Sequence, residues 1–311
     1  MFLSTPISTL VNACIIIFGT LICATAIYLI LQVINSRFRS EEINQRLQVF
    51  WMISLVFMLS MSAGAISVIL LFLYLSFLAL REFSSIVSLG KSDLGLRSAV
   101  FIILFGHYCA IVFGFKITFI ISPILLIVSV LLFYALKKKD ISAKIASVWL
   151  FGVLATVFLL SFSTLFAMES FTQNAMDGVG LIIYLVFLTE LNDVFQFVWG
   201  KAFGRRKIVP RISPNKTLEG FVGGLFSTVI VATLICGSLT SLSILSAAIS
   251  GVVIAVSGFV GDVAFSYIKR LHNKKESGDL LPGHGGILDR VDSICFSSVA
   301  FIIFISTNSL F

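Results

Sequence analysis

The sequence predicts an all-α, polytopic integral membrane protein with about ten transmembrane helices. Its 311 residues are 58% hydrophobic and only 12% charged, and the mean hydropathy is +1.08. A water-soluble globular domain is far less apolar, so the composition excludes that class. Several charge-poor runs also reach the roughly 20 residues that a helix needs to cross a bilayer. The basic residues, finally, are concentrated in every second loop between these runs.

The expected helices follow from the apolar runs in chain order. The run from residue 48 to residue 80 would be roughly 50 Å long as one helix, which is too long for a straight crossing, so we expect a break between Ser62 and Gly64. The first run lacks a basic n-region and is too long for a signal peptide, which favours a retained outward-to-inward anchor. The ten predicted helices lie near residues 7–34, 48–62, 64–80, 98–115, 117–136, 146–168, 178–200, 217–237, 243–268 and 288–308.

The distribution of Lys and Arg predicts how these helices are oriented. Loops that stay in the cytoplasm carry an excess of basic residues. With ten spans, one set of alternate loops holds all of the 22 Lys and Arg residues except Lys116. Both termini are therefore expected to face outward, and a polar cavity to face the cytoplasm. The net charge of +7 follows from this orientation and from anionic lipid, so it gives no support for nucleic-acid binding.

The chain is expected to form one transmembrane domain over residues 1–311. Within it, residues 1–176 are interpreted as N-terminal scaffold helices. Residues 177–311 carry the candidate catalytic residues and the two longest cytoplasmic loops, 201–216 and 269–287. The five cysteines lie in or beside the predicted helices, without the spacing of a metal site or a disulfide framework.

Carboxylates within membrane helices are costly and usually mark a functional site. Asp193 and Asp262 lie about two turns from the cytoplasmic ends of their helices, and Asp289 and Asp292 share a face at the start of the last helix. All four are expected near the level of a phospholipid phosphate, where hard oxygen ligands of this kind suit Mg²⁺. The helix dipole alone would explain Asp292, and hydrogen bonds between helices would explain Asp193 and its neighbour Glu190.

The loop "GRRKIVPRISPNKTLEGFVGG" is typical of an anion-binding segment. Ser213 is expected to cap a helix that starts at Pro214, which places Lys216 and Thr217 in its first turn beside free backbone N–H groups. The arginines of this loop add charge for a triphosphate, although positive-inside bias explains about half of its basic residues. His284, in the turn "PGHGG", could contact a phosphate, but a lone loop histidine more often has no chemical role.

Together these stretches resemble the phosphatidate cytidylyltransferase (CDP-diacylglycerol synthase) family. The signature-like part is Ser266 to Asp292 with "LPGHGGILDRVD", and "SPNKTLEGFVGG", "ND" followed by "WGKAFG", and "LREF" occur in the family's order. The resemblance implies transfer from CTP to phosphatidate, giving CDP-diacylglycerol and pyrophosphate. It also implies Mg²⁺, a monovalent cation such as K⁺, a homodimer, and a bacterial cytoplasmic membrane with the active site facing the cytoplasm.

The resemblance also implies roles for individual residues. Catalytic roles fall on Asp262, Asp289, Asp292, Lys269 and Arg270, with the three aspartates as metal ligands. Substrate-binding roles fall on Asp193, Ser213, Lys216, Thr217, His284 and Arg290.

Two positions depart from the family pattern. Glu276 stands where the signature has aspartate, and Phe265 stands where many members have an acid. These departures leave three alternatives open. They are a cytidylyltransferase or kinase with another lipid acceptor, an ion-coupled transporter, and a family member that binds lipid without catalysis.

Overall fold

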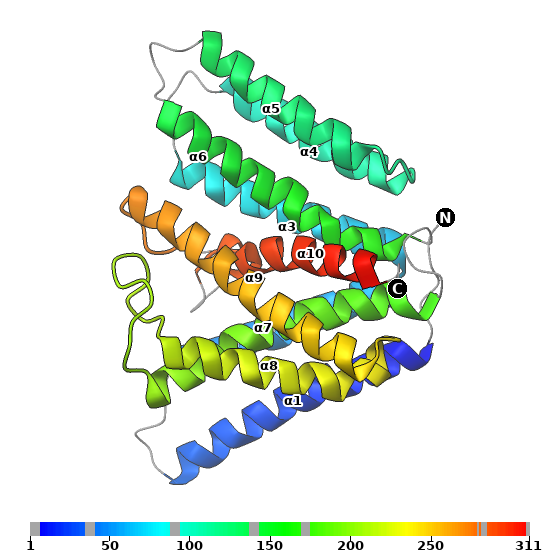
Figure 1. The fold of residues 1–311 in the computed structure, drawn as a ribbon, viewed down its shortest axis with the longest axis vertical. Helices are drawn as coiled ribbons and strands as arrows, with labels where there is room; N and C mark the ends of the chain where they lie inside the picture. The colour runs from blue at the N-terminus through cyan, green and yellow to red at the C-terminus, as the bar shows by residue number, and fades with distance from the viewer. Residues whose placement is uncertain are drawn as a thin grey trace.

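The computed structural model describes residues 7–34, 41–87, 94–136, 143–168, 175–278, 280 and 285–308 of the chain. These residues form ten α-helices and no β-strand, which confirms the all-α class (Figure 1). The helices are α1 (Ile7–Ile34), α2 (Glu41–Ser62), α3 (Ala65–Ile86), α4 (Leu94–Val112), α5 (Thr118–Leu136), α6 (Ala143–Val153), α7 (Ala175–Phe203), α8 (Leu218–Leu239), α9 (Ile244–Leu271) and α10 (Leu288–Asn308).

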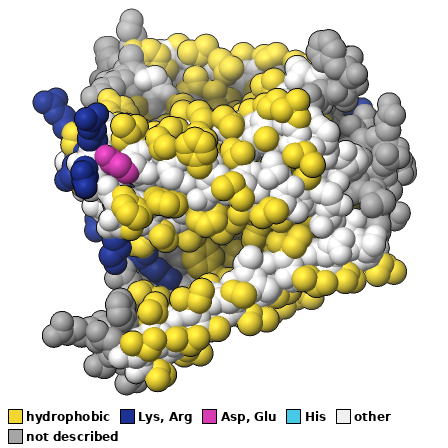
Figure 2. Space-filling model, turned by 60° about the horizontal axis from the view of Figure 1, so that its bottom comes forward, with side chains coloured by type: hydrophobic (Ala, Val, Ile, Leu, Met, Phe, Trp, Pro, Cys, Tyr) yellow, Lys and Arg dark blue, Asp and Glu magenta, His cyan; other side chains and the backbone are white. Residues whose placement is uncertain are grey.

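The helices form an integral membrane bundle with its charge gathered at one end. Within the described residues, 8 segments are long and apolar enough to cross a membrane, and α2 and α10 are the two helices outside that set. Figure 2 shows hydrophobic side chains spread over one face and Lys and Arg side chains collected mainly at one end of it. In Figure 1 the start of α1 and the end of α10 lie at the end opposite the α7–α8 loop. This arrangement agrees with termini on a common side; which side faces the cytoplasm stays a prediction.

The predicted break between the second and third helices is confirmed. Helix α2 ends at Ser62 and α3 begins at Ala65, with Gly64 between them at φ 97°. Glycine adopts this left-handed conformation without the steric cost that a Cβ atom brings. The Ser60 hydroxyl donates a 2.9 Å hydrogen bond to the Ser67 carbonyl and so ties the two helices together across the break.

The sixth predicted span is less regular than expected. Helix α6 continues as a π-helix (Leu154–Leu159) and a 3-10 helix (Phe162–Ala167). A π turn widens the helix and leaves backbone groups in need of other partners. The Leu159 carbonyl accepts a 2.6 Å hydrogen bond from the Ser298 hydroxyl of α10, which joins this irregular segment to the helix that carries Asp289 and Asp292.

Close backbone packing brings the last four helices together. Helix α7 lies along α8, and α9 lies against both α8 and α10. A Cβ atom at Gly220 would lie 2.7 Å from the Gln196 carbonyl oxygen, and one at Gly224 would lie 3.1 Å from the Gln196 nitrogen. A Cβ atom at Gly261 would lie 2.5 Å from the Asp292 carbonyl oxygen. The glycines therefore allow α7–α8 and α9–α10 contacts that a larger residue would prevent, as expected for small residues in membrane helices.

Candidate active site

Four aspartates from three helices meet at the charged end of the bundle. Asp193 comes from α7, Asp262 from α9, and Asp289 and Asp292 from the start of α10. The carboxylates of Asp193, Asp262 and Asp292 interact electrostatically with one another, and Asp292 also interacts with Asp289. The Ser293 hydroxyl donates a 2.9 Å hydrogen bond to Asp193 Oδ2, which joins α10 to α7. The structure therefore brings together the four acids that the sequence singled out.

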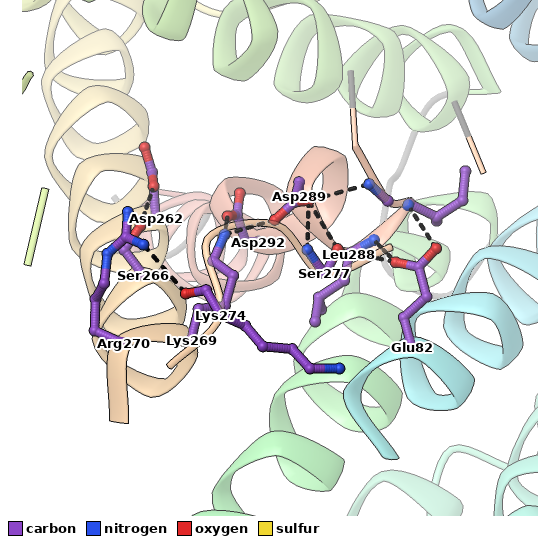
Figure 3. A network of polar contacts seen from close by, with 12 residues as sticks. Glu82, Asp262, Ser266, Lys269, Arg270, Lys274, Ser277, Leu288, Asp289 and Asp292 are labelled. Carbon is purple, nitrogen blue, oxygen red and sulfur yellow. Dashed lines mark hydrogen bonds and ion pairs between the residues drawn. The ribbon is translucent and has the colours of Figure 1, made fainter. Parts of the chain in front are cut away.

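Two lysines, Lys269 and Lys216, neutralise part of this negative charge, and Figure 3 shows Lys269 beside Asp289 and Asp292. Lys269, on α9, places its Nζ 2.5 Å from Asp289 Oδ1 and 4.0 Å from Asp292 Oδ2. Lys216 forms an ion pair with Asp262 Oδ2, and its Nζ lies 4.6 Å from the centroid of the Phe259 ring. Both lysine side chains are largely buried, which strengthens their interaction with the carboxylates relative to an ion pair in water. Lys216 therefore connects the α7–α8 loop to the acid of α9.

The Asp289 carboxylate is held by backbone as well as by Lys269. Its Oδ2 accepts hydrogen bonds from the Ser277 N–H at 2.9 Å, the Ser277 hydroxyl at 2.8 Å and the Gly286 N–H at 3.1 Å. Charge-assisted hydrogen bonds of this kind are stronger than neutral ones and restrict the side chain. Asp289 is therefore a fixed member of the cluster.

Glu82 of α3 is a site residue that the sequence analysis missed. Its carboxylate accepts hydrogen bonds from Ile287 N–H, Leu288 N–H and the Ser277 hydroxyl at 3.0, 2.8 and 3.0 Å. The residue is buried, with 5% of its surface exposed. A signal was present, because a carboxylate inside an apolar run is a site candidate by default, and Glu82 lies in the "LREF" stretch of the first half.

The anion-binding loop differs from its prediction in one respect. Helix α8 begins at Leu218, and its N-cap is Thr217, whose Oγ1 accepts a 3.1 Å hydrogen bond from Gly220 N–H. The prediction that Ser213 caps this helix is therefore wrong. Ser213 lies in a preceding turn, where its own N–H donates to the Val209 carbonyl at 2.9 Å. Lys216 consequently precedes the helix instead of lying in its first turn.

The same loop is closed by Glu219, a residue that the sequence analysis did not select. Its carboxylate accepts hydrogen bonds from the backbone N–H groups of Arg205 at 2.9 Å and Arg206 at 3.1 Å. Leu218 N–H donates to the Arg206 carbonyl at 2.7 Å, and Lys207 pairs with Thr217 as an isolated β-bridge. The loop therefore has a fixed shape, with Arg205, Arg206, Lys207 and Arg211 exposed.

The remaining predicted residues lie around the cluster. Arg270 donates from Nε to the Ile212 carbonyl at 3.1 Å and from Nη1 to the Lys274 carbonyl at 3.2 Å, so it joins the two loops. Arg290 interacts electrostatically with Glu190 of α7.

The two residues that depart from the family pattern lie in different surroundings. Phe265 is buried, with 1% of its surface exposed, and it packs on the Phe151 ring at 5.9 Å. Glu276 is exposed. His284 lies outside the described residues.

The donor chemistry of the cluster fits a divalent cation such as Mg²⁺, which prefers carboxylate oxygens. Among the described residues, however, no group of three or more His, Cys, Asp or Glu side chains is arranged as a set of metal ligands. Lys216 and Lys269 pair with Asp262 and Asp289 in this structure. A bound cation and these ammonium groups would therefore compete for the same oxygens.

Fold and site define an integral membrane protein with a charged site at one end of its helices. The chain belongs to the cytidylyltransferase family, whose model, described as "Cytidylyltransferase family", matches residues 44–308. It is therefore a nucleotidyltransferase, as the resemblance implied.

Several bacterial proteins are similar to this chain. The chain is 37% identical over 292 residues to a protein of Escherichia coli named "Uncharacterized protein YnbB", covering 93% of this chain and 96% of that one. It is 39% identical over 127 residues to a "Phosphatidate cytidylyltransferase" of Staphylococcus haemolyticus and 40% identical over 128 residues to one of Staphylococcus aureus. These two matches cover 40% of this chain and 49% of each relative, so the chain matches about half of their length.

Proposed function

We propose that this protein transfers the cytidylyl group of CTP to phosphatidate, forming CDP-diacylglycerol and releasing pyrophosphate. The observation that carries the proposal is the cluster of Asp193, Asp262, Asp289 and Asp292 with Lys216 and Lys269 at one end of a membrane bundle. A phospholipid presents its phosphate near the ends of membrane helices, and the family is described as a cytidylyltransferase family. The two staphylococcal relatives carry the name of this enzyme.

In the proposed reaction, a phosphate oxygen of phosphatidate attacks the α-phosphorus of CTP. A new P–O bond forms, the bond from the α-phosphorus to the bridging oxygen breaks, and pyrophosphate leaves with that electron pair. The acceptor is already an anion, so no general base and no covalent enzyme intermediate are needed. Positioning and charge neutralisation are the main contributions that the protein must make.

Lys216, Lys269 and Arg270 are the residues that would supply charge neutralisation. Lys216 lies next to the N-cap residue Thr217, where backbone N–H groups and the positive end of the α8 dipole favour a phosphate. We assign the nucleotide phosphates to this region and the lipid phosphate to the neighbourhood of Lys269 and the start of α10. Arg270 would keep the two regions together through its hydrogen bonds to both loops.

We propose Mg²⁺ as the cofactor, held by Asp262, Asp289 and Asp292. When bound, it would neutralise phosphate charge on the leaving pyrophosphate. Lys216 and Lys269, which pair with Asp262 and Asp289 in this structure, would be available to the phosphates when the carboxylates hold the cation. A monovalent cation, a homodimer and a cytoplasm-facing site in a bacterial inner membrane belong to the same proposal.

A second candidate is transfer to another lipid phosphate. It is favoured by one observation, namely that the chain aligns with nearly all of the Escherichia coli relative but with only half of each staphylococcal enzyme. Glu276, which departs from the signature, directly precedes Ser277, and Phe265, the other departure, lies four residues before Lys269. The reaction class is the same in both cases.

The test is pyrophosphate release from CTP by the detergent-solubilised full-length protein with Mg²⁺. Three acceptor conditions are compared, namely phosphatidate, a polyprenyl phosphate and no added lipid. Release with phosphatidate and recovery of a CDP-lipid product would support the proposal. Release only with polyprenyl phosphate would transfer the assignment to the second candidate. Absence of release under all three conditions would overturn both.

A further inference from the structure

We propose that Glu82 is a positioning residue that holds the start of α10 and thereby fixes the Asp289 carboxylate for the reaction proposed above. Glu82 belongs to the scaffold half of the chain, and its hydrogen-bond partners lie 195 to 206 residues further on. Figure 3 shows its carboxylate pointing from α3 toward Ser277 and Leu288, beside Asp289. The inference depends on the proposed function only for its effect on turnover.

The first reason is the backbone at the start of α10. The first N–H groups of a helix have no partner within the helix and need an acceptor. A Ser, Thr, Asp or Asn side chain usually supplies one, yet Gly286 and Ile287 precede this helix. Glu82 supplies the acceptors from a different helix, through Oε1 to Ile287 N–H at 3.0 Å and Oε2 to Leu288 N–H at 2.8 Å.

The second reason is the space around the carboxylate. A Cβ atom at Gly278 would lie 3.1 Å from Glu82 Oε1, and a Cβ atom at Gly286 would overlap Oε2. Glycine at both positions therefore lets the carboxylate approach the backbone closely. Such a buried charge is costly unless it is fully hydrogen-bonded, and here the helix start provides the donors.

The third reason is the link from Glu82 to Asp289. The Ser277 hydroxyl lies 3.0 Å from Glu82 Oε2 and 2.8 Å from Asp289 Oδ2, so its one proton is shared between the two carboxylates and links them. Ser277 N–H and Gly286 N–H also donate to Asp289 Oδ2. The segment that Glu82 fixes is thus the segment that supplies the donors to Asp289. Asp289 in turn pairs with Lys269.

Glu82→Gln is the sharpest variant because it keeps the shape and removes the charge. The amide oxygen of Gln can accept a hydrogen bond from either Ile287 N–H or Leu288 N–H. The amide NH₂ group then faces the other N–H, and two donors cannot bond to each other. Loss of outer-shell partners of this kind commonly reduces activity roughly 10- to 100-fold. We expect a fall in kcat of that size with a small change in the KM for CTP, because the α7–α8 loop does not contact Glu82 through any of the hydrogen bonds described above.

The experiment measures kcat and KM together with hydrogen exchange of the backbone amides over residues 277–288. Faster exchange there in Glu82→Gln, with unchanged exchange in α8, is the expected result. Glu41→Gln, the same change at an exposed position on α2, is the control and should alter neither quantity. Ser277→Ala, which removes only the bridging hydroxyl, is the second variant if Glu82→Gln fails to insert, and it should lower kcat less.

Each readout can contradict the proposal separately. Unchanged exchange over residues 277–288 in Glu82→Gln would overturn the positioning role, whether or not the protein is active. Wild-type kcat in Glu82→Gln, or equal loss in kcat and in the affinity for CTP, would overturn it as well. If the unsubstituted protein releases no pyrophosphate with any acceptor, the proposed function fails, while the exchange result still decides the role of Glu82 at the start of α10.

Discussion

Lys269 Nζ is 2.5 Å from Asp289 Oδ1 and 4.0 Å from Asp292 Oδ2, so one ammonium group of α9 serves two aspartates that are one turn apart on α10. The contact joins the end of one membrane helix to the beginning of the next. It also reduces the net negative charge at the place where the proposed substrates would bring their phosphates.

Removal of this ammonium group should destabilise the protein. Lys269→Met leaves buried carboxylates without their counter-charge, and breaking a buried ion pair from one side costs about 3–5 kcal/mol. Thermal unfolding in detergent measures the change, and added Mg²⁺ should restore part of the loss. Lys201→Met, at an exposed position on α7, should leave the unfolding temperature nearly unchanged. An unaltered transition in Lys269→Met would show that the pair contributes no stability.

Asp289→Asn should abolish turnover while the protein still inserts into the membrane. The substitution removes one negative charge and places an amide NH₂ group against the Ser277 and Gly286 donors. We expect a fall in kcat of at least about 100-fold, the scale seen when one charge-stabilising group is lost. Membrane fractionation checks insertion, and pyrophosphate release checks turnover. Turnover at the original rate would remove Asp289 from the mechanism.

Chelation of divalent cations should stop the reaction reversibly. With excess EDTA, pyrophosphate release should fall to the background rate, and Mg²⁺ should restore it, because a hard cation held by the carboxylates would neutralise phosphate charge. In Asp262→Asn, a higher Mg²⁺ concentration should be needed for half-maximal activity. Full activity in EDTA would contradict the assignment of a divalent cofactor.

Thr217→Ala and Ser213→Ala should differ in stability. Thr217 caps α8 and Ser213 lies in the preceding turn, so only the first change removes a helix cap, at a cost of about 1 kcal/mol. The measurement is the thermal unfolding temperature of the two variants in the same detergent. A larger loss in Ser213→Ala than in Thr217→Ala would contradict the observed start of the helix.

The positions of the helices were predictable because apolar length is a local property of the chain. The break at Gly64 followed from the length limit on one crossing, and the last apolar run, expected near residues 288–308, forms α10 over Leu288–Asn308. The π-helix at Leu154–Leu159 did not, since a change in hydrogen-bond register leaves hydropathy unaltered.

The candidate site was predictable in its acids and less so in their partners. Aspartates within apolar helices can be recognised in the sequence because burying a carboxylate in a membrane costs free energy. The pairing of Lys216 with Asp262 depends on how α8 and α9 pack, and residue spacing along one helix does not predict that packing. Ser213 and Thr217 can both cap a helix, so the sequence alone did not separate them. Glu82 was missed because its partners are about 200 residues away.

The glycines of α8 and α9 restrict the route by which a lipid can reach the aspartates. Gly220 and Gly224 bring α8 so close to α7 that even one methyl group would be crowded, and Gly261 does the same between α9 and α10. A fatty-acyl chain is wider than a methyl group, so it cannot pass between α7 and α8 or between α9 and α10 at these glycines. In the proposed reaction, a diacyl lipid would therefore have to approach the aspartates by a route other than these two helix pairs.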